Sequence, residues 1–562
     1  MVVDMRRAQS DQHSTAPQAF PPVSDPGVPP VGSPSSGLPD PSQQPLSRRA
    51  RRQSEHALAT GGIKSVVVFL VALLVFGCGG YAAYSMIVNR SAPSLPIPGA
   101  APGGSITIGL TTAPESLDIR KQDGDAVAQA LLGNVYETLV QRGEDNTAQP
   151  GIAKSWDVSD DGLSYTFHLA DGVTFSNGDQ LNADDVVYSL QQILQKQYVG
   201  ASDLTNLSSV KATGSSTVVI KLSQPMPQLP WVLSGRAGII YDETAKVNYT
   251  TNAVGSGPFT VESWKKGEPI TLKANTSYWG TKAKIGTVTL KYFDDATAAA
   301  SELKSGDIQA LMPTDATNAN DLKTQDGITV AQTESTRKVV LGFNSSADSL
   351  FSDARVRQSA RMAIDKNAIV QANGAAETLG GPIPKLDPGY EDLTGLYPLD
   401  QAKAKSLVSY FRLRTMKLVY PSSLGEQIGQ TIKNDLAAAG IPVEVSMVDD
   451  ATWQQTVVQD KQFDLTIYTM DSSHDAGDFV ARDNFLQYTN AEVESLYAQA
   501  QGATTSDDYA NRLREYAHKL SEDSPADWLY VERPWVAYKS TVKGLPTAMV
   551  DCYLPLANVT VG

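Results

Sequence analysis

Side chains able to do chemistry are few and scattered in this sequence. The five histidines of the chain are His13, His56, His168, His474 and His518. No two of them have the spacing of metal ligands, and no nucleophile elbow, metalloprotease helix, phosphate loop or dinucleotide fingerprint occurs. The pairs Asp184-Asp185 and Asp294-Asp295 are more typical of helix starts or turns than of acid–base catalysis. We therefore predict a binding protein with no catalytic residues, metal or cofactor, and not an enzyme.

The clearest local structure is a hairpin that leads into a helix. Apolar and polar residues alternate over residues 163–169, which is the period-two pattern of a half-buried strand. Asp-Gly at 171–172 and Asn-Gly at 177–178 are tight-turn pairs. Asn182 and the two aspartates after it predict a capped helix from residue 183 to 193.

Two further helices follow from capping and periodicity. Asp353 predicts the cap of a helix that extends to residue 365, with apolar residues on one face. Residues 416–420, 425–439 and 443–448 read as strand, helix and strand, so we expect a parallel pair with a right-handed crossover. These elements predict an α/β protein.

The amino-acid sequences of several segments resemble those of one known family. Residues 155–175 and 182–189 resemble the signature region of the extracytoplasmic solute-binding proteins, family 5, the oligopeptide/dipeptide-binding type of ABC transporters. Further similar motifs occur in the family's order: Ser116-Leu117-Asp118, Tyr136-Glu-Thr-Leu139, Gly255-Ser-Gly-Pro-Phe259, Asn275–Gly280 and Glu302–Gln309. We expect a helix over 127–139, and positive φ at the glycines of the Gly-Ser-Gly-Pro turn. The resemblance covers about residues 105–545.

The resemblance implies a two-lobed α/β fold of the type II periplasmic-binding-protein-like class, with an additional subdomain in the first lobe. The predicted regions are a disordered Pro-rich cytoplasmic arm (1–62), a transmembrane anchor (63–89), a linker (90–104), the first lobe (105–340) with its small subdomain (142–253), the second lobe (341–527) and a C-terminal return to the first lobe (528–562). Residues 1–60 contain almost no large apolar side chains, which predicts disorder.

Residues 65–88 contain no charged side chain, and a helix of that length, roughly 36 Å, spans a hydrocarbon core of about 30 Å. Four arginines at 48–52 precede it, so the positive-inside rule predicts a single-pass protein of the cell membrane with an extracytoplasmic C-terminal domain. The alternative is a lipoprotein anchored at Cys78, because Val75-Phe-Gly-Cys78 approximates a lipobox. The bulky Phe76 and the long preceding arm favour the uncleaved anchor.

Charge separates the two parts of the chain. The net charge is −15 for the whole chain, whereas residues 1–90 hold eight basic and five acidic side chains, so the remainder carries −18. An acidic domain of this kind is a poor partner for nucleic acid and is compatible with cationic or zwitterionic solutes.

Two loops match the positions at which the family binds its ligands. In peptide-binding relatives the peptide pairs with backbone groups and an aspartate takes its α-amino group. The predicted ligand-binding residues are Asp123, Gly124 and Asp125 in the first loop, Met470, Asp471, Ser472, Ser473, His474 and Asp475 in the second, and Tyr198 as a candidate aromatic wall beside Trp231 and Trp453. The second loop departs from the family, since Met470 stands where relatives often have Trp and Ala476 where they have Pro. Asp471 and Asp475 remain alternative receptors for the amine.

The resemblance implies a membrane-anchored binding component of a peptide-type ABC importer, which captures short peptides by closure of its lobes and delivers them to permease subunits. Alternative solutes in similar domains are oligosaccharides, opines and nickel chelates. A second alternative is a sensor that signals through the N-terminal arm.

Overall fold

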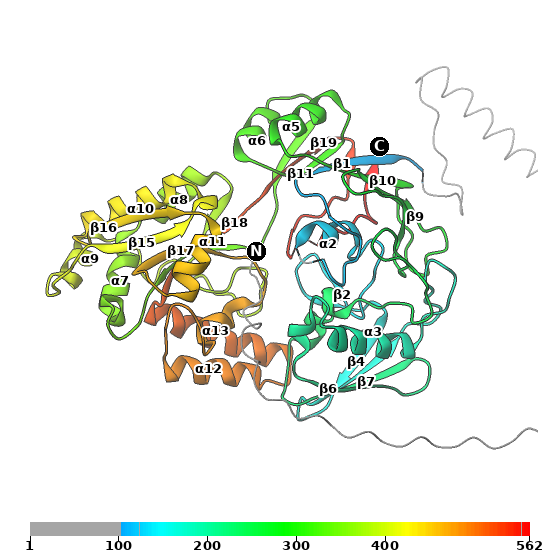
Figure 1. Ribbon diagram of the computed structural model, residues 1–562, viewed down its shortest axis with the longest axis horizontal. Coiled ribbons are helices and arrows are strands. Elements are labelled where there is room, and N and C mark those ends of the chain that lie inside the picture. Colours follow the sequence, from blue (N-terminus) through cyan, green and yellow to red (C-terminus); the bar gives the residue numbers. More distant parts are fainter. Residues whose placement is uncertain (1–102, 123, 552) are drawn as a thin grey trace, which may run out of the picture. The chain divides into compact units, whose positions relative to one another are not determined.

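The computed structural model describes residues 103–122, 124–551 and 553–562 (Figure 1). The predicted arm and anchor, and all but the end of the predicted linker, lie outside these residues. Within the described ranges, no helix combines the length and the apolar character needed to cross a membrane. The described residues form sheets of seven, six and four strands, with two short two-stranded ribbons, and helices pack on the sheets.

The seven-stranded sheet of the first lobe has the order β12-β19-β11-β1-β10-β9-β8. Its strands are β1 (Ser105–Leu110), β8 (Phe259–Ser263), β9 (Ile270–Ala274), β10 (Thr287–Tyr292), β11 (Ala310–Thr314), β12 (Ile328–Gln332) and β19 (Trp535–Lys539). β1 pairs in parallel with β10 and β11, whereas the other neighbours are antiparallel. β19 inserts between β11 and β12, so the chain re-enters this sheet near its C-terminus.

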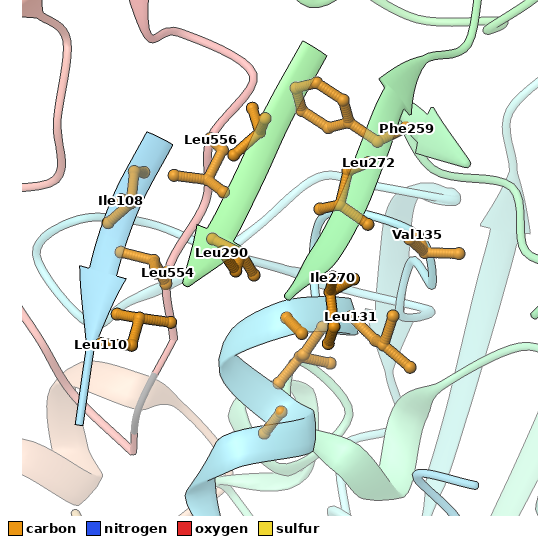
Figure 2. Close-up of a cluster of buried hydrophobic side chains, with 14 of the residues drawn as sticks. Ile108, Leu110, Leu131, Val135, Phe259, Ile270, Leu272, Leu290, Leu554 and Leu556 are labelled. Carbon is orange, nitrogen blue, oxygen red and sulfur yellow. The ribbon is translucent and has the colours of Figure 1, made fainter. Parts of the chain in front are cut away.

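The two faces of this sheet bury different cores. One face packs on α2 (Asp125–Leu131) and on the C-terminal segment, and Figure 2 labels side chains of this core: Ile108, Leu110, Leu131, Val135, Phe259, Ile270, Leu272, Leu290, Leu554 and Leu556. The other face packs on α5 (Ala296–Ser305) and α6 (Ala316–Leu322) through Leu303, Leu311 and Leu322. Full burial of each such side chain contributes about 1.5–3 kcal/mol.

The predicted hairpin and helix lie in a subdomain of the first lobe. Its sheet has the order β4-β5-β7-β6, with β4 (Ala153–Val158), β5 (Ser164–Leu169), β6 (Leu207–Ala212) and β7 (Thr217–Leu222). Asn182 and Asp185 form a capping box at the start of α3 (Ala183–Lys196), and α3 shares a core with this sheet. The predicted strand and capped helix are confirmed, and the helix extends to residue 196. The predicted hairpin is wrong, because β5 pairs with β4 and β7 and residues 171–175 form no strand.

The six-stranded sheet of the second lobe has the order β14-β18-β13-β17-β15-β16. Its strands are β13 (Lys338–Phe343), β14 (Ala376–Thr378), β15 (Met416–Pro421), β16 (Val443–Val448), β17 (Leu465–Met470) and β18 (Ala526–Glu532). β15 and β16 are parallel and α10 (Glu426–Ala438) connects them, which confirms the predicted strand–helix–strand unit.

Helices cover both faces of this sheet. Neighbouring residues of β13 point to opposite faces, so they contact different helices. Val339 and Leu341 share a core with α7 (Ala354–Ala363), α8 (Lys366–Asn373), α9 (Gln401–Val408) and α10. Val340 shares the other core with α12 (Ala491–Gln501) and α13 (Ser506–Asp523). Asp353 caps α7 as predicted, although this helix ends at Ala363.

The chain passes between the two large sheets through two segments, residues 333–337 and 533–534. The segments lie side by side, since the Thr333 N–H donates to the Pro534 carbonyl at 2.9 Å. Arg533 forms ion pairs with Glu334 at 2.9 Å and Glu377 at 2.5 Å. The predicted lobe borders at residues 340 and 527 fall inside β13 and β18, and both strands belong to the six-stranded sheet of the second lobe.

Two further local predictions are wrong, and both concern the region around residues 131–135. The helix predicted over 127–139 ends at Leu131, because Gly133 has φ +74° and the buried Asn134 amide donates instead to the Leu554 carbonyl at 2.8 Å. Gly255 and Gly257 do not have positive φ. They are needed for close approach, since a Cβ at Gly255 would lie 2.0 Å from the Val135 carbonyl oxygen.

A buried charge cluster in the second lobe predicts a large effect of one substitution. Asp527 is fully buried and pairs with Arg361 at 3.2 Å and Lys366 at 2.6 Å. Asp527→Asn leaves two cations without their counter-ion, so we expect the free energy of unfolding to fall by about 3–5 kcal/mol. Denaturant unfolding measures this loss.

The control is Lys154→Ala, which removes the exposed pair with Asp171 and is expected to cost less than about 1 kcal/mol. Equal stabilities of the two variants would contradict the assignment of a critical buried ion cluster.

Candidate functional site

The loop after β17 holds the two aspartates predicted to receive an amine, and both already contact cations. The Arg337 guanidinium lies 2.9 Å from Asp471, and the Lys338 ammonium lies 2.6 Å from Asp475. Lys338 has no exposed surface. These cations sit where the first crossover segment enters β13, so the loop is tied to the junction of the two sheets.

Burial dominates the electrostatics of Asp475. Loss of water raises the pKa of this carboxyl to about 7, although the nearby Lys338 opposes the rise. At neutral pH the Asp475 carboxyl is therefore either protonated or paired with Lys338, and in neither state does it present an unpaired negative charge. Its neighbour His474 is also buried, and burial lowers the pKa of this imidazole, which is therefore neutral at pH 7.

Residues of the two lobes meet around Asn146, in the turn between β2 (Gln141–Arg142) and β3 (Ala148–Gln149). The Asn146 amide donates to Asp387 Oδ1 at 3.0 Å and to Ser473 Oγ at 2.8 Å, both in the second lobe. The backbone N–H of His474 donates to Asp387 Oδ2 at 2.9 Å, and the Ser473 hydroxyl also donates to Asp387. All these donors are uncharged.

A ring stack crosses the same boundary. Trp231, on α4 (Leu229–Val232) of the first lobe, lies with its ring 3.8 Å from that of His474, at an interplanar angle of 10°. The Trp231 indole N–H donates to Asn146 Oδ1 at 3.1 Å, which fixes both side chains. The Arg142 guanidinium lies 4.5 Å from the Trp231 ring centroid, a cation–π distance.

The C-terminal segment completes the contact. Asp551 accepts from the Arg142 guanidinium at 2.5 Å and from the Ser473 N–H at 3.1 Å, so one carboxylate joins both lobes. The cross-lobe cluster is defined by these residues: Arg142, Asn146, Trp231, Asp387, Ser473, His474 and Asp551. A small cavity beside Asp387 and His474, lined also by Tyr497 and Tyr509, has a volume of about 10 Å³. That is room for about one water.

The structure brings only part of the predicted second loop into this cluster. Ser473 and His474 belong to it, whereas Met470 is buried in the second-lobe core and Ser472 is exposed. Asp471 and Asp475 face Arg337 and Lys338. Their role as solute ligands stays a prediction.

The predicted first loop has other neighbours. Asp123 lies outside the described residues, and Asp125 is exposed in the first turn of α2. The Gly124 carbonyl accepts from Arg236 at 3.2 Å. The Tyr198 ring lies 5.3 Å from the Arg120 guanidinium. These contacts are within the first lobe.

Sequence reasoning missed four members of the cross-lobe cluster: Arg142, Asn146, Asp387 and Asp551. Arg142 ends the short strand β2 and the other three lie in turns or loops, and together they span more than 400 residues of sequence. Trp231 was considered as an aromatic wall. The sequence Asp-Pro-Gly at 387–389 indicates a turn and does not indicate a binding role.

Comparison with known proteins decides the family. A sequence model described as "Bacterial extracellular solute-binding proteins, family 5 Middle" matches residues 147–491, more than half of the chain. The chain belongs to this family. Its relatives are substrate-binding proteins of ABC transporters and not enzymes, which confirms the prediction of a binding protein.

One curated relative of this family 5 protein is the oligopeptide-binding protein AppA of Bacillus subtilis (strain 168), 25% identical over 521 residues, which are 85% of this chain and 94% of AppA. DppA of Helicobacter pylori, solved with the peptide STSA, has a TM-score of 0.66 and 22% identity, covering 82% of this chain and 98% of DppA. NikA of Staphylococcus aureus, solved with Ni(L-His)2, has a TM-score of 0.64 and 20% identity, covering 82% of this chain and 100% of NikA. These structures share the periplasmic-binding-protein-like fold.

The raised pKa of Asp475 predicts a pH-dependent stability. A carboxyl whose pKa is higher in the folded state than its ordinary 3.8 contributes stability that is complete below pH 3.8 and is lost as the pH rises to about 7. The difference in unfolding free energy between the wild type and Asp475→Asn should therefore fall by roughly 2–4 kcal/mol between acidic and neutral pH. Urea unfolding of both proteins over this range measures it. A difference that does not change with pH would show that burial of Asp475 does not control its protonation.

Proposed function

We propose that this chain is the solute-binding component of a peptide-type ABC importer, and that it captures short peptides by closure of its two lobes. The observation that carries the proposal is the cross-lobe cluster. Asn146 and Trp231 of the first lobe meet Asp387, Ser473 and His474 of the second through hydrogen bonds and a ring stack. Polar residues converging from two lobes are what a closing binding site requires.

The two crossover segments support a hinge. Residues 333–337 and 533–534 carry the chain between sheets, and no helix or strand of the described residues spans both lobes. A few residues at such points can absorb the rotation of one lobe against the other. Arg533, paired with Glu334 and Glu377, holds the two segments together while the lobes move.

The cavity beside Asp387 supports an opening step. Its volume of about 10 Å³ excludes any peptide, and its lining lies in the second lobe alone. A solute held between the lobes therefore needs the direct contacts of Asn146 and Trp231 with the second lobe to open first. Closure then removes water from the polar groups of the cluster, and each hydrogen bond or ion pair to the solute becomes stronger in the drier environment.

Peptides are the solute class that the comparisons favour. AppA is named as an oligopeptide-binding protein and DppA was solved with a peptide, whereas NikA was solved with a nickel–histidine complex. The described residues contain no group of three or more acidic, histidine or cysteine side chains suited to holding a metal ion. Permease subunits that accept the peptide complete the proposed pathway.

Anchoring to the cell membrane is the final part of the proposal. The uncharged segment 65–88 would hold the chain as a single-pass protein, and Cys78 offers the lipid-modified alternative. Labelling of cells with radioactive palmitate separates the two. We expect no label on the wild type, and label that disappears in Cys78→Ala would overturn the uncleaved anchor in favour of the lipoprotein.

Calorimetry tests the solute class. Titration of the full chain with an equimolar tripeptide mixture should release heat with saturation, while an oligosaccharide pool and nickel–histidine should give dilution heats alone. Saturable binding of oligosaccharide or nickel–histidine, with none of peptide, would reject peptides as the solute.

A further inference from the structure

We infer that Asp387 receives a positively charged group of the solute, the terminal amine if the solute is a peptide, in place of Asp471 and Asp475. This inference rests on the proposed function, and it names the residue that makes the main electrostatic contact with the solute. Asp387 belongs to the loop between β14 and α9, a part of the sequence in which no binding residue was predicted. Three observations support the inference: the net negative charge of the cross-lobe cluster, the cations that already contact Asp471 and Asp475, and the ring nitrogens of His474, which lack hydrogen-bond partners.

The negative charge of Asp387 lacks a cationic partner. This residue is 7% exposed, and its carboxylate oxygens accept from the Asn146 amide, the Ser473 hydroxyl and the His474 backbone N–H, all of them neutral groups. Arg142, the one cation of the cluster, is paired with Asp551 at 2.5 Å. With His474 neutral, the cross-lobe cluster carries a net charge of −1. A buried carboxylate gains strongly from a cation, so the cluster is complementary to a positively charged solute.

The predicted alternatives already contact cations of the protein. Arg337 lies 2.9 Å from Asp471 and 3.5 Å from Glu532, and Lys338 lies 2.6 Å from Asp475. A solute amine at either position would have to compete with a protein cation that is tethered beside the carboxylate. At Asp387 it would compete with neutral donors alone, and charge-assisted hydrogen bonds are roughly twice as strong as neutral ones.

His474 supplies the independent sign of a ligand. Its side chain is 10% exposed, yet neither ring nitrogen has a hydrogen-bond partner among the described residues. Its Nε2 lies 4.0 Å from Asp387 Oδ1, too far for a hydrogen bond. A buried polar ring left without partners is costly, and a polar solute bound between the lobes would supply the missing acceptor or donor.

The aromatic rings suit the same kind of group. The His474 ring, which stacks on Trp231, lies with its Nε2 4.0 Å from Asp387 Oδ1, and Arg142 already uses the Trp231 ring as a cation–π partner. When the lobes separate, the stack opens, and an ammonium group can lie against the Trp231 face while it donates to Asp387. A primary amine has three donors, enough for the carboxylate and for one neighbouring acceptor.

Asp242 provides a matched control in the first lobe. It is 3% exposed and also accepts from neutral donors, the Asn177 amide at 2.7 Å and the hydroxyl and backbone N–H of Thr244, both at 2.8 Å. Its partners all lie in the same lobe, within residues 177–244. Asp242→Asn therefore reproduces the loss of a buried carboxylate without touching the lobe boundary.

The experiment compares an equimolar tripeptide mixture with the same mixture after N-acetylation, which removes the amine charge. Calorimetry gives apparent Kd values for the wild type, Asp387→Asn and Asp242→Asn. We expect the wild type and Asp242→Asn to bind the free mixture at least tenfold more tightly than the acetylated one. Asp387→Asn should bind the free mixture at least tenfold more weakly than the wild type and lose the preference.

Retention of the free-amine preference by Asp387→Asn would overturn the assignment of Asp387 while leaving the proposed function intact. A wild type that binds neither mixture would overturn the peptide solute, and this inference with it. Circular dichroism and thermal unfolding verify that each variant folds. If Asp387→Asn does not fold, Asp387→Glu keeps the charge but displaces it, and at least threefold weaker binding of the free mixture alone is expected. Unchanged affinity of Asp387→Glu for both mixtures would contradict the inference.

Discussion

Lys338 has no exposed surface, and the need to balance its charge shapes the junction of the two lobes. It lies at the first position of β13, directly after a crossover segment, and Asp475 provides its counter-ion from the loop after β17. Because burial of the Lys338 ammonium without a polar partner would cost several kcal/mol, its hydrogen bond to Asp475, whether that carboxyl is ionised or protonated, fixes the loop that carries Ser473 and His474. Those two residues then face the first lobe, where Asn146 and Trp231 meet them.

The need of buried polar and charged groups for partners also explains why solute binding and lobe closure are coupled. Each lobe alone leaves part of the cross-lobe cluster without partners: Asp387 loses Asn146, and His474 loses the Trp231 ring. In the closed form these contacts are made, but the charge of Asp387 remains without a cation. A cationic solute that replaces the Trp231–His474 stack would contact both Asp387 and the first lobe, so it would stabilise a closed form more than the open one. Only such differential affinity can shift the equilibrium. The proposed hinge, the cluster and the solute charge therefore form one mechanism.

Local signals in the sequence were sufficient for several individual helices and strands, whereas the two-lobed fold was implied by the family resemblance. Asn182 and Asp353 cap helices where predicted, and the strand–helix–strand unit of β15, α10 and β16 was readable from periodicity, because each depends on residues close in sequence. Long-range contacts limited the rest. Helix α2 stops early since Asn134 is bonded to Leu554 and Leu556, more than 400 residues away.

The binding site shows the same limit. Family resemblance pointed to the loop at 470–475 and thus to Ser473 and His474, but it also pointed to Asp471 and Asp475, which contact Arg337 and Lys338. Nothing near Asp387 in the sequence distinguishes it from an ordinary turn residue such as Asp392. Its importance arises from Asn146, 241 residues earlier, and from the burial that the meeting of two lobes creates.

The central claim is that solute is held between the lobes at the cross-lobe cluster. Hydrogen exchange of the full chain, with and without a saturating tripeptide mixture, tests it most directly. The account predicts that peptide slows exchange of backbone amides in both lobes together, at Asn146 and Thr147 in the first and at Ser473 and His474 in the second. Slowing confined to one lobe, or at segments outside the cluster, would contradict it.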